Sequence, residues 1–157
     1  MHTIFSIDPG VTTGVCLGLL EDRDLKLKLS EMTMTPREMY DWLEDIMGLV
    51  EPPHQVHIVY EDFNYRNVAR AGLDLTPVKL IGVIEVFRER HEPIVTFTKQ
   101  TAATGKAYFT DDKLKRLGIY VKGKKHGRDA MRHLLQWYTF GPGSQYGNVD
   151  ATRLVTM

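Results

Sequence analysis

The sequence is poor in cysteine and has no long apolar run. Cys16 is its only cysteine, which excludes an internal disulfide and predicts a reducing compartment. No apolar stretch approaches the roughly 18 to 20 residues that cross a bilayer, and the first residues lack the basic and apolar regions of a secretion signal. We therefore expect a soluble cytoplasmic protein that has no membrane partner.

Two common nucleotide-binding motifs are also missing. No G-x-G-x-x-G follows the first predicted strand, and no G-x-x-x-x-G-K-[ST] occurs anywhere, so neither a dinucleotide-binding fold nor a P-loop enzyme is indicated. The composition is ordinary for a globular protein, with 43% hydrophobic and 25% charged residues. The length predicts a single domain over residues 1–157, with a flexible, glycine-rich tail from about residue 141.

The net charge of zero conceals a strong asymmetry along the chain. Residues 1–98 carry 9 Lys and Arg against 16 Asp and Glu, whereas residues 99–133 carry 10 against 3. A basic run is often only a solvated face, but its position beside candidate catalytic acids favours binding to nucleic acid. The lysines expected to hold phosphates are Lys99, Lys106, Lys113, Lys115, Lys122, Lys124 and Lys125.

Hydrophobic patterning predicts an α/β chain of order β-β-β-α-β-α-β-α. The predicted strands are residues 3–8, 14–20, 24–32, 56–60 and 93–98, and the predicted helices run from 36 to about 49, from 73 to about 90 and from 127 to about 138. The first helix begins with a capping box, in which Thr35 precedes Pro36 and Glu38. The second helix has a wide apolar arc, which predicts either a central place in the core or a dimer interface.

Asp8 ends the first predicted strand, directly before the turn-forming pair Pro9-Gly10. A buried carboxylate without a nearby Lys or Arg needs a cation to offset its desolvation. The alternative is an ordinary turn aspartate. Glu61 ends the fourth predicted strand, and it would lie near Asp8 if these two strands were neighbours in the sheet.

His126 and Asp129 are three positions apart, so they share one face of the last predicted helix. Together with Asp8 and Glu61 they form an oxygen-rich set with one imidazole, which suits Mg²⁺ or Mn²⁺ better than structural zinc. The alternatives are a surface histidine among lysines for His126, a helix-dipole partner for Asp129, and an ordinary strand-end acid for Glu61.

In their order along the chain, these motifs resemble RuvC-type Holliday junction resolvases, a family of the ribonuclease H-like superfamily, although the first motif is one residue shorter between Gly10 and Thr13. The resemblance covers roughly residues 3–139. It rests on Ser6-Ile7-Asp8-Pro9-Gly10 with Thr13-Gly14, on Tyr60-Glu61 with Phe63, on Lys99-Gln100-Thr101 with Gly105 and Lys113, and on the run from His126 to Ala130. The chain departs from the family at two positions: it has His126 in place of an acid, and Asn64 in place of the phenylalanine that wedges the junction. The histidine and the short length are most similar to bacteriophage members.

The resemblance implies the ribonuclease H-like fold, with a five-stranded mixed sheet flanked by helices, and a homodimer. It implies an endonuclease that resolves Holliday junctions and other branched DNA, leaving 5′-phosphate and 3′-hydroxyl ends. Asp8, Glu61, His126 and Asp129 would be catalytic and would hold two Mg²⁺ ions, for which Mn²⁺ can substitute. Phe63, Tyr65 and Arg66 would contact DNA at the branch point, where aromatic rings can stack on unpaired bases; core packing is the alternative.

Three other functions remain open at this stage. A related fold could act on RNA, or the protein could bind branched DNA without cutting it. A sugar-kinase-like phosphotransferase also carries an Asp-x-Gly-x-Thr loop, but such enzymes duplicate the fold and need a second nucleotide loop, for which we expect 157 residues to leave no room. Cleavage of junction DNA, or ATP turnover without DNA, would separate these functions.

Overall fold

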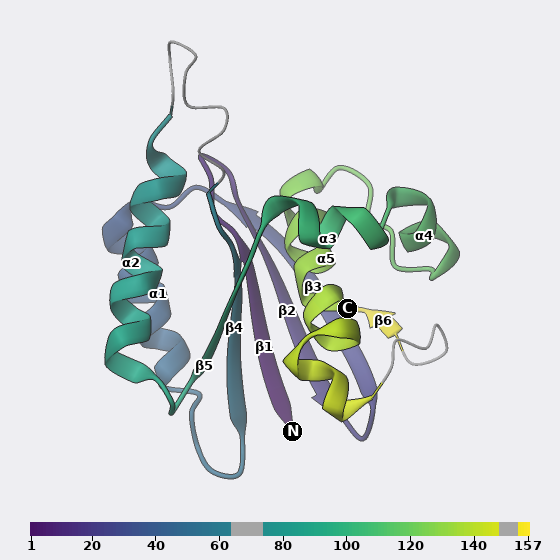
Figure 1. The fold of residues 1–157 in the computed structure, drawn as a ribbon, viewed down its shortest axis with the longest axis horizontal. Helices are drawn as coiled ribbons and strands as arrows, with labels where there is room; N and C mark the ends of the chain where they lie inside the picture. Colours follow the sequence, from purple (N-terminus) through teal and green to yellow (C-terminus); the bar gives the residue numbers. More distant parts are fainter. Residues whose placement is uncertain (64–73, 148–153) are drawn as a thin grey trace.

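The described residues form a six-stranded sheet with helices on both faces (Figure 1). The computed structural model describes residues 1–63, 74–147 and 154–157. The strands follow the order β5-β4-β1-β2-β3-β6 across the sheet. Their bounds are β1 His2–Asp8, β2 Thr13–Glu21, β3 Asp24–Met32, β4 Gln55–Glu61, β5 Thr96–Gln100 and β6 Leu154–Thr156.

The pairing of β1 decides where the functional side chains lie. This strand is antiparallel to β2 and parallel to β4, and β4 is parallel to β5. Ile7 pairs with Tyr60, and Glu61 pairs with Gln100. Because parallel strands end at the same edge of a sheet, Asp8, Glu61 and Gln100 meet there. The first and fourth predicted strands are neighbours, which is the condition under which Asp8 and Glu61 were expected to lie near each other.

The β2–β3 hairpin turns where the sequence predicts a turn, at residues 21–24. Asp22 and Arg23 both have left-handed backbone conformations, with φ of 47° and 75°. Positive φ at both central residues is typical of the two-residue hairpins whose twist matches the flanking strands.

The described residues form five α-helices, of which the first two lie on one face of the sheet and the last packs on the other (Figure 1). Their bounds are α1 Pro36–Met47, α2 Thr76–His91, α3 Ala102–Tyr108, α4 Asp111–Arg116 and α5 Lys125–Phe140, and a short 3₁₀ helix, η2, spans Pro142–Tyr146. One hydrophobic core lies between the sheet and α1 and α2, and a second lies between the sheet and α5. In the described part of the chain, no helix is both long and apolar enough to span a bilayer.

The capping box of α1 is confirmed. The Glu38 backbone N–H donates to the Thr35 hydroxyl at 3.2 Å, and the Thr35 N–H donates to the Glu38 carboxylate at 2.7 Å. Met39, Leu43 and Ile46 then bury one face of the helix. Such a cap stabilises a helix by about 1 kcal/mol.

The wide apolar arc of α2 resolves into one buried face. Leu80, Ile81, Ile84 and Phe87 are buried at helical spacing against the sheet, whereas Val86 is 53% exposed. The helix therefore covers the sheet from the surface of the protein. A dimer interface on its outer face stays a prediction.

The structure also contains elements that the sequence did not predict. The expected five strands are one too few, because Leu154 pairs with Leu25 and adds β6 to the edge of the sheet. Two short helices, α3 and α4, lie within the basic stretch, and η2 packs against α5 where a flexible tail was expected. A three-residue strand and helices of two turns or fewer are too short to give a clear periodicity.

His2 and His57 form a partly buried pair near the other end of β1 and β4. His2 Nδ1 lies 3.1 Å from His57 Nε2, and His57 Nδ1 lies 2.5 Å from the Thr96 hydroxyl. The Trp137 ring packs on His57 at 4.9 Å between centroids. Burial, and then the neighbouring His2, lower the pKa of His57 to about 4.

We expect this pair to make the folded state sensitive to acid. An unfolded His57 binds a proton near its ordinary pKa of 6.5, but the folded residue does so only near 4. The free energy of unfolding therefore falls by about 2 kcal/mol as the pH drops from 6.5 to 4. Urea unfolding of His57→Gln across this range should show a smaller loss. The exposed His54 gives the control: His54→Gln should lose as much stability as the wild type, and an equal loss in His57→Gln would contradict the assignment.

Candidate active site at the strand ends

Asp8 meets the first turn of α5 at the edge of the sheet. His126 Nδ1 lies 3.2 Å from Asp8 Oδ2. Gly14, the partner of Asp8 on β2, makes this approach possible, because a Cβ at that position would lie 2.1 Å from the His126 carbonyl oxygen. The glycine of the Thr13-Gly14 motif therefore lets α5 rest directly on β2, which brings His126 to the carboxylate.

The pKa of Asp8 shows that negative charge gathers here. Burial, and after it repulsion from Glu61 and Asp129, raise this pKa from 3.8 to about 6. The hydrogen bond from His126 lowers it in part. Glu61, His126 and Asp129, the other three predicted catalytic residues, are therefore all close enough to Asp8 to shift its pKa.

Glu61 contacts a histidine that was not among the predicted site residues. His133 Nε2 lies 2.7 Å from Glu61 Oε2, and His133 Nδ1 lies 2.8 Å from Gln100 Oε1. The His133 side chain is fully buried. It lies on α5 four residues after Asp129, so helical spacing places both residues on the side of α5 that faces the strand ends.

Asp129 is buried and lies between two cations. The Arg132 guanidinium donates to Asp129 and to Asp111, and its Nε donates to the Phe109 carbonyl at 2.7 Å. Lys106 Nζ lies 3.2 Å from Asp129 Oδ2. Lys106 was predicted to hold a DNA phosphate, but here it pairs with a carboxylate of the site itself, because the unpredicted helix α3 places it beside α5.

Contacts from β3 fix the start of α5. The Gly127 N–H donates to Glu31 Oε1 at 3.1 Å, and Lys124 Nζ donates to the Leu29 carbonyl at 2.8 Å. Glu31 thereby accepts a hydrogen bond from an amide of the first helical turn, which has no acceptor within the helix. Lys124 holds the segment before the helix. Lys124 was predicted to bind phosphate, and in this structure it also has this structural role.

The donor set fits a hard divalent cation. Three carboxylates and one imidazole lie near the end of β1, where repulsion from Glu61 and Asp129 adds to the burial that raises the pKa of Asp8. In residues 1–63, 74–147 and 154–157, however, no three such side chains are gathered closely enough to hold a metal as they stand. Each carboxylate instead contacts a basic side chain. Asp8 contacts His126 and Glu61 contacts His133. Asp129 contacts Arg132 and Lys106. A metal would have to displace some of these contacts.

The predicted DNA-contacting aromatic residues have different outcomes. The half-buried Phe63 packs against the core under α1 and α2, and its N–H donates to Asp62 Oδ1 at 2.9 Å. This placement favours the core-packing alternative for Phe63. Tyr65 and Arg66 lie outside the described residues.

The remaining lysines of the basic stretch differ in their contacts. Lys99 pairs with Glu85 at 3.0 Å, and Lys113 lies over the Tyr108 ring at 3.0 Å from its centroid. Lys115 lies 3.7 Å from Asp112. Lys122 and Lys125 are exposed on either side of Lys124, next to the start of α5. The last two are therefore the best placed to meet a phosphate near His126.

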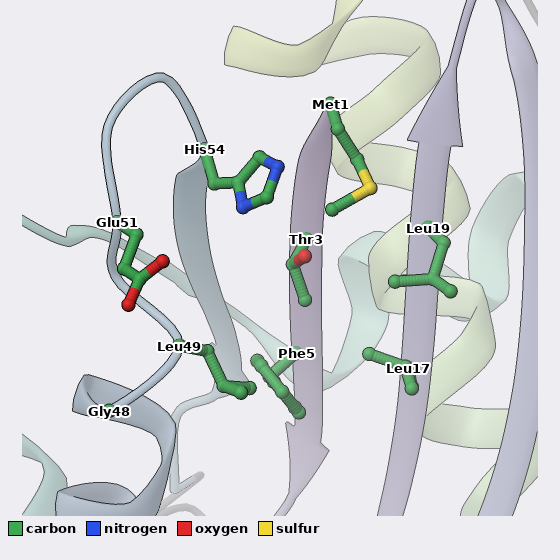
Figure 2. A pocket seen from close by; sticks show the side chains of 9 residues that line it. All are labelled: Met1, Thr3, Phe5, Leu17, Leu19, Gly48, Leu49, Glu51 and His54. Carbon is green, nitrogen blue, oxygen red and sulfur yellow. The ribbon is translucent and has the colours of Figure 1, made fainter.

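A separate cavity of about 440 Å³ opens on the face of the sheet that α1 and α2 cover (Figure 2). Phe5, Leu17 and Leu19 form its floor on β1 and β2, and Glu51 and His54 stand on the loop before β4. None of the predicted catalytic residues lines it. The cavity and the carboxylates are thus distinct features.

Comparison with known proteins supports the fold. No protein-family model matches this chain, and no curated protein matches its sequence. The structure shows the mixed α/β architecture of the ribonuclease H-like fold. A solved structure similar to it is the crystal structure of the yeast mitochondrial Holliday junction resolvase Ydc2, with a TM-score of 0.50 and 14% sequence identity. The match covers 90% of this chain and 82% of the yeast chain. At this identity the likeness shows the fold, and the predicted fold class is confirmed.

Proposed function

We propose that this protein is a structure-selective DNA endonuclease that resolves Holliday junctions and other branched DNA. The observation that carries the proposal is that Glu61 and Asp129 lie close enough to Asp8, at the end of β1, to add to the burial that raises its pKa to about 6. Crowded, partly buried carboxylates with a perturbed pKa are typical of catalytic sites. The sequence motifs and the likeness to a resolvase structure support the same function.

The proposed reaction is phosphodiester hydrolysis that leaves 5′-phosphate and 3′-hydroxyl ends. Asp8, Glu61, His126 and Asp129 would hold two Mg²⁺ ions, with Mn²⁺ able to substitute. Bound ions of this kind activate water and neutralise charge on the phosphate. His126 directs Nδ1 at the Asp8 carboxylate, so that nitrogen donates and Nε2 can accept a proton from water or bind an ion. Arg132 holds Asp129 in place from within the helix.

One gel experiment tests this proposal. Labelled four-way junction, flap, plain duplex and RNA–DNA hybrid would each be incubated with Mg²⁺, Mn²⁺ or EDTA. We expect cuts in the branched DNA with either metal and none with EDTA. Cleavage of the hybrid alone would favour a nuclease that acts on RNA, and cleavage of the duplex at the same rate would contradict selectivity for structure.

A non-catalytic binder of branched DNA is the second candidate. The observation that favours it is that every predicted catalytic carboxylate already contacts a basic side chain. Tight junction binding without cleavage in both metals would select this function.

A nuclease that cuts both strands of a junction needs two sites, so we also propose a two-fold homodimer. Sedimentation of the protein with and without DNA would test this proposal.

Neutralising Lys122 and Lys125 together should weaken binding to every DNA shape. Each phosphate contact releases counterions, so the slope of log K against log salt should flatten by about two in Lys122→Gln/Lys125→Gln. Lys124 is left intact because it supports the start of α5. The matched control is Lys26→Gln/Lys28→Gln, on exposed positions of β3. If both double variants kept the wild-type slope, Lys122 and Lys125 would be solvated surface only.

A further inference from the structure

Gln100 makes two hydrogen bonds to a single residue of α5. It is the last residue of β5, directly opposite Glu61 on β4. Its Nε2 donates to the His133 backbone carbonyl at 3.2 Å, and its Oε1 lies 2.8 Å from His133 Nδ1. Gln100 is 8% exposed and His133 is fully buried, so both hydrogen bonds lie away from solvent.

The backbone carbonyl fixes the orientation of the whole arrangement. A carbonyl oxygen can only accept, so the amide nitrogen of Gln100 must face it and Oε1 must face the imidazole ring. The amide oxygen can likewise only accept, so His133 Nδ1 carries a proton. Gln100 therefore requires a proton on His133 Nδ1, because its amide oxygen can only accept.

The opposite side of the ring then engages Glu61. His133 Nε2 lies 2.7 Å from Glu61 Oε2, and a hydrogen bond between these two atoms requires a proton between them. The ring thus bridges Gln100 and Glu61 and takes up one of the two oxygens of this carboxylate. Gly105 closes the arrangement from α3, since a Cβ there would lie 3.2 Å from His133 N.

We propose that Gln100 is a positioning residue that acts on Glu61 through His133. By keeping a proton on Nδ1 and fixing the plane of the ring, it holds the Glu61 carboxylate in one orientation at the strand ends. What the carboxylate does in that orientation rests on the proposed nuclease function. Groups that orient a metal-binding side chain in this way typically change metal affinity by about 10- to 100-fold when removed.

Two substitutions separate the hydrogen bond from packing. Gln100→Met keeps the length of the side chain and removes the acceptor, whereas Gln100→Glu keeps an acceptor for His133 Nδ1. Gln55→Met, at the exposed start of β4, is the control. Two measurements apply to the intact protein: the ¹⁵N NMR shifts of the His133 ring without metal, and Mg²⁺ binding by calorimetry.

We expect the wild type and Gln100→Glu to show a proton on Nδ1, and Gln100→Met to lose this single state. Mg²⁺ affinity should fall about tenfold in Gln100→Met, recover in Gln100→Glu and be unchanged in Gln55→Met. A wild-type ring without a proton on Nδ1, which needs no variant to detect, would overturn the inference, as would a Gln100→Met variant with wild-type ring shifts. Absence of Mg²⁺ binding and cleavage in the wild type would instead overturn the proposed function and leave the NMR test intact.

Discussion

Asp8→Asn should abolish cleavage of branched DNA and at the same time make the protein more stable. The folded pKa of Asp8 is about 6 against an ordinary value of 3.8, so its carboxylate destabilises the fold as the pH rises through this interval. At neutral pH the amide should therefore stabilise the protein by about 2 kcal/mol, or roughly 4 to 8 °C in Tm. Junction binding should remain, because no basic side chain is removed.

Thermal melts with and without metal connect both effects to one site. Mg²⁺ should raise the Tm of the wild type, because it binds the folded state, and should leave that of Asp8→Asn unchanged. The exposed Asp24 in the β2–β3 hairpin provides the control, and Asp24→Asn should behave as the wild type. Cleavage at the wild-type rate by Asp8→Asn would refute the site. If the Tm of Asp8→Asn were lower than that of the wild type both below and above pH 6, the account of the Asp8 charge would be refuted.

His126→Ala should reduce the cleavage rate by about 10²- to 10⁴-fold, the range typical of a lost general base. His126→Asp should restore much of the rate, because aspartate at this position offers an oxygen ligand from the same turn of α5. The loss of the His126 hydrogen bond should also raise the pKa of Asp8 above its present value, since that bond lowers it. Carboxyl ¹³C NMR would measure this shift without any substrate.

His54→Ala is the control for the loss of an imidazole, since His54 is exposed on the loop before β4. It should leave both the rate and the Asp8 pKa unchanged. Full activity in His126→Ala, with an unmoved Asp8 pKa, would assign His126 to the basic surface. Asp8, Glu61 and Asp129 would then form the whole site.

The sequence predicts the long elements of this fold because their patterns extend over several repeats. The strands ending at Asp8 and Glu61 and the helix carrying Asp129 are all present, and the capping box at Thr35 has the expected contacts. The short elements α3, α4 and β6 are missed, since none spans enough residues to show a period.

The contacts around the predicted catalytic residues could not be predicted in the same way. Gln100 and His133 are 33 positions apart, and Gly127 and Glu31 are 96 apart. These contacts exist only after the strands and α5 have packed, and no local motif marks them. Lys106 shows the same limit: the charge of the basic stretch is evident, but its pairing with Asp129 depends on where α3 lies.

The close seating of α5 on Gly14 has a consequence for the protein during its synthesis. The strand carrying Asp8 leaves the ribosome long before His126 and Asp129, and these residues reach the strand ends only when α5 docks across β2. Such contacts between distant parts of the chain form late in folding. A nascent chain that has folded only its first strands therefore carries no complete site, and the proposed cleavage activity should appear only once the helix has been made and packed.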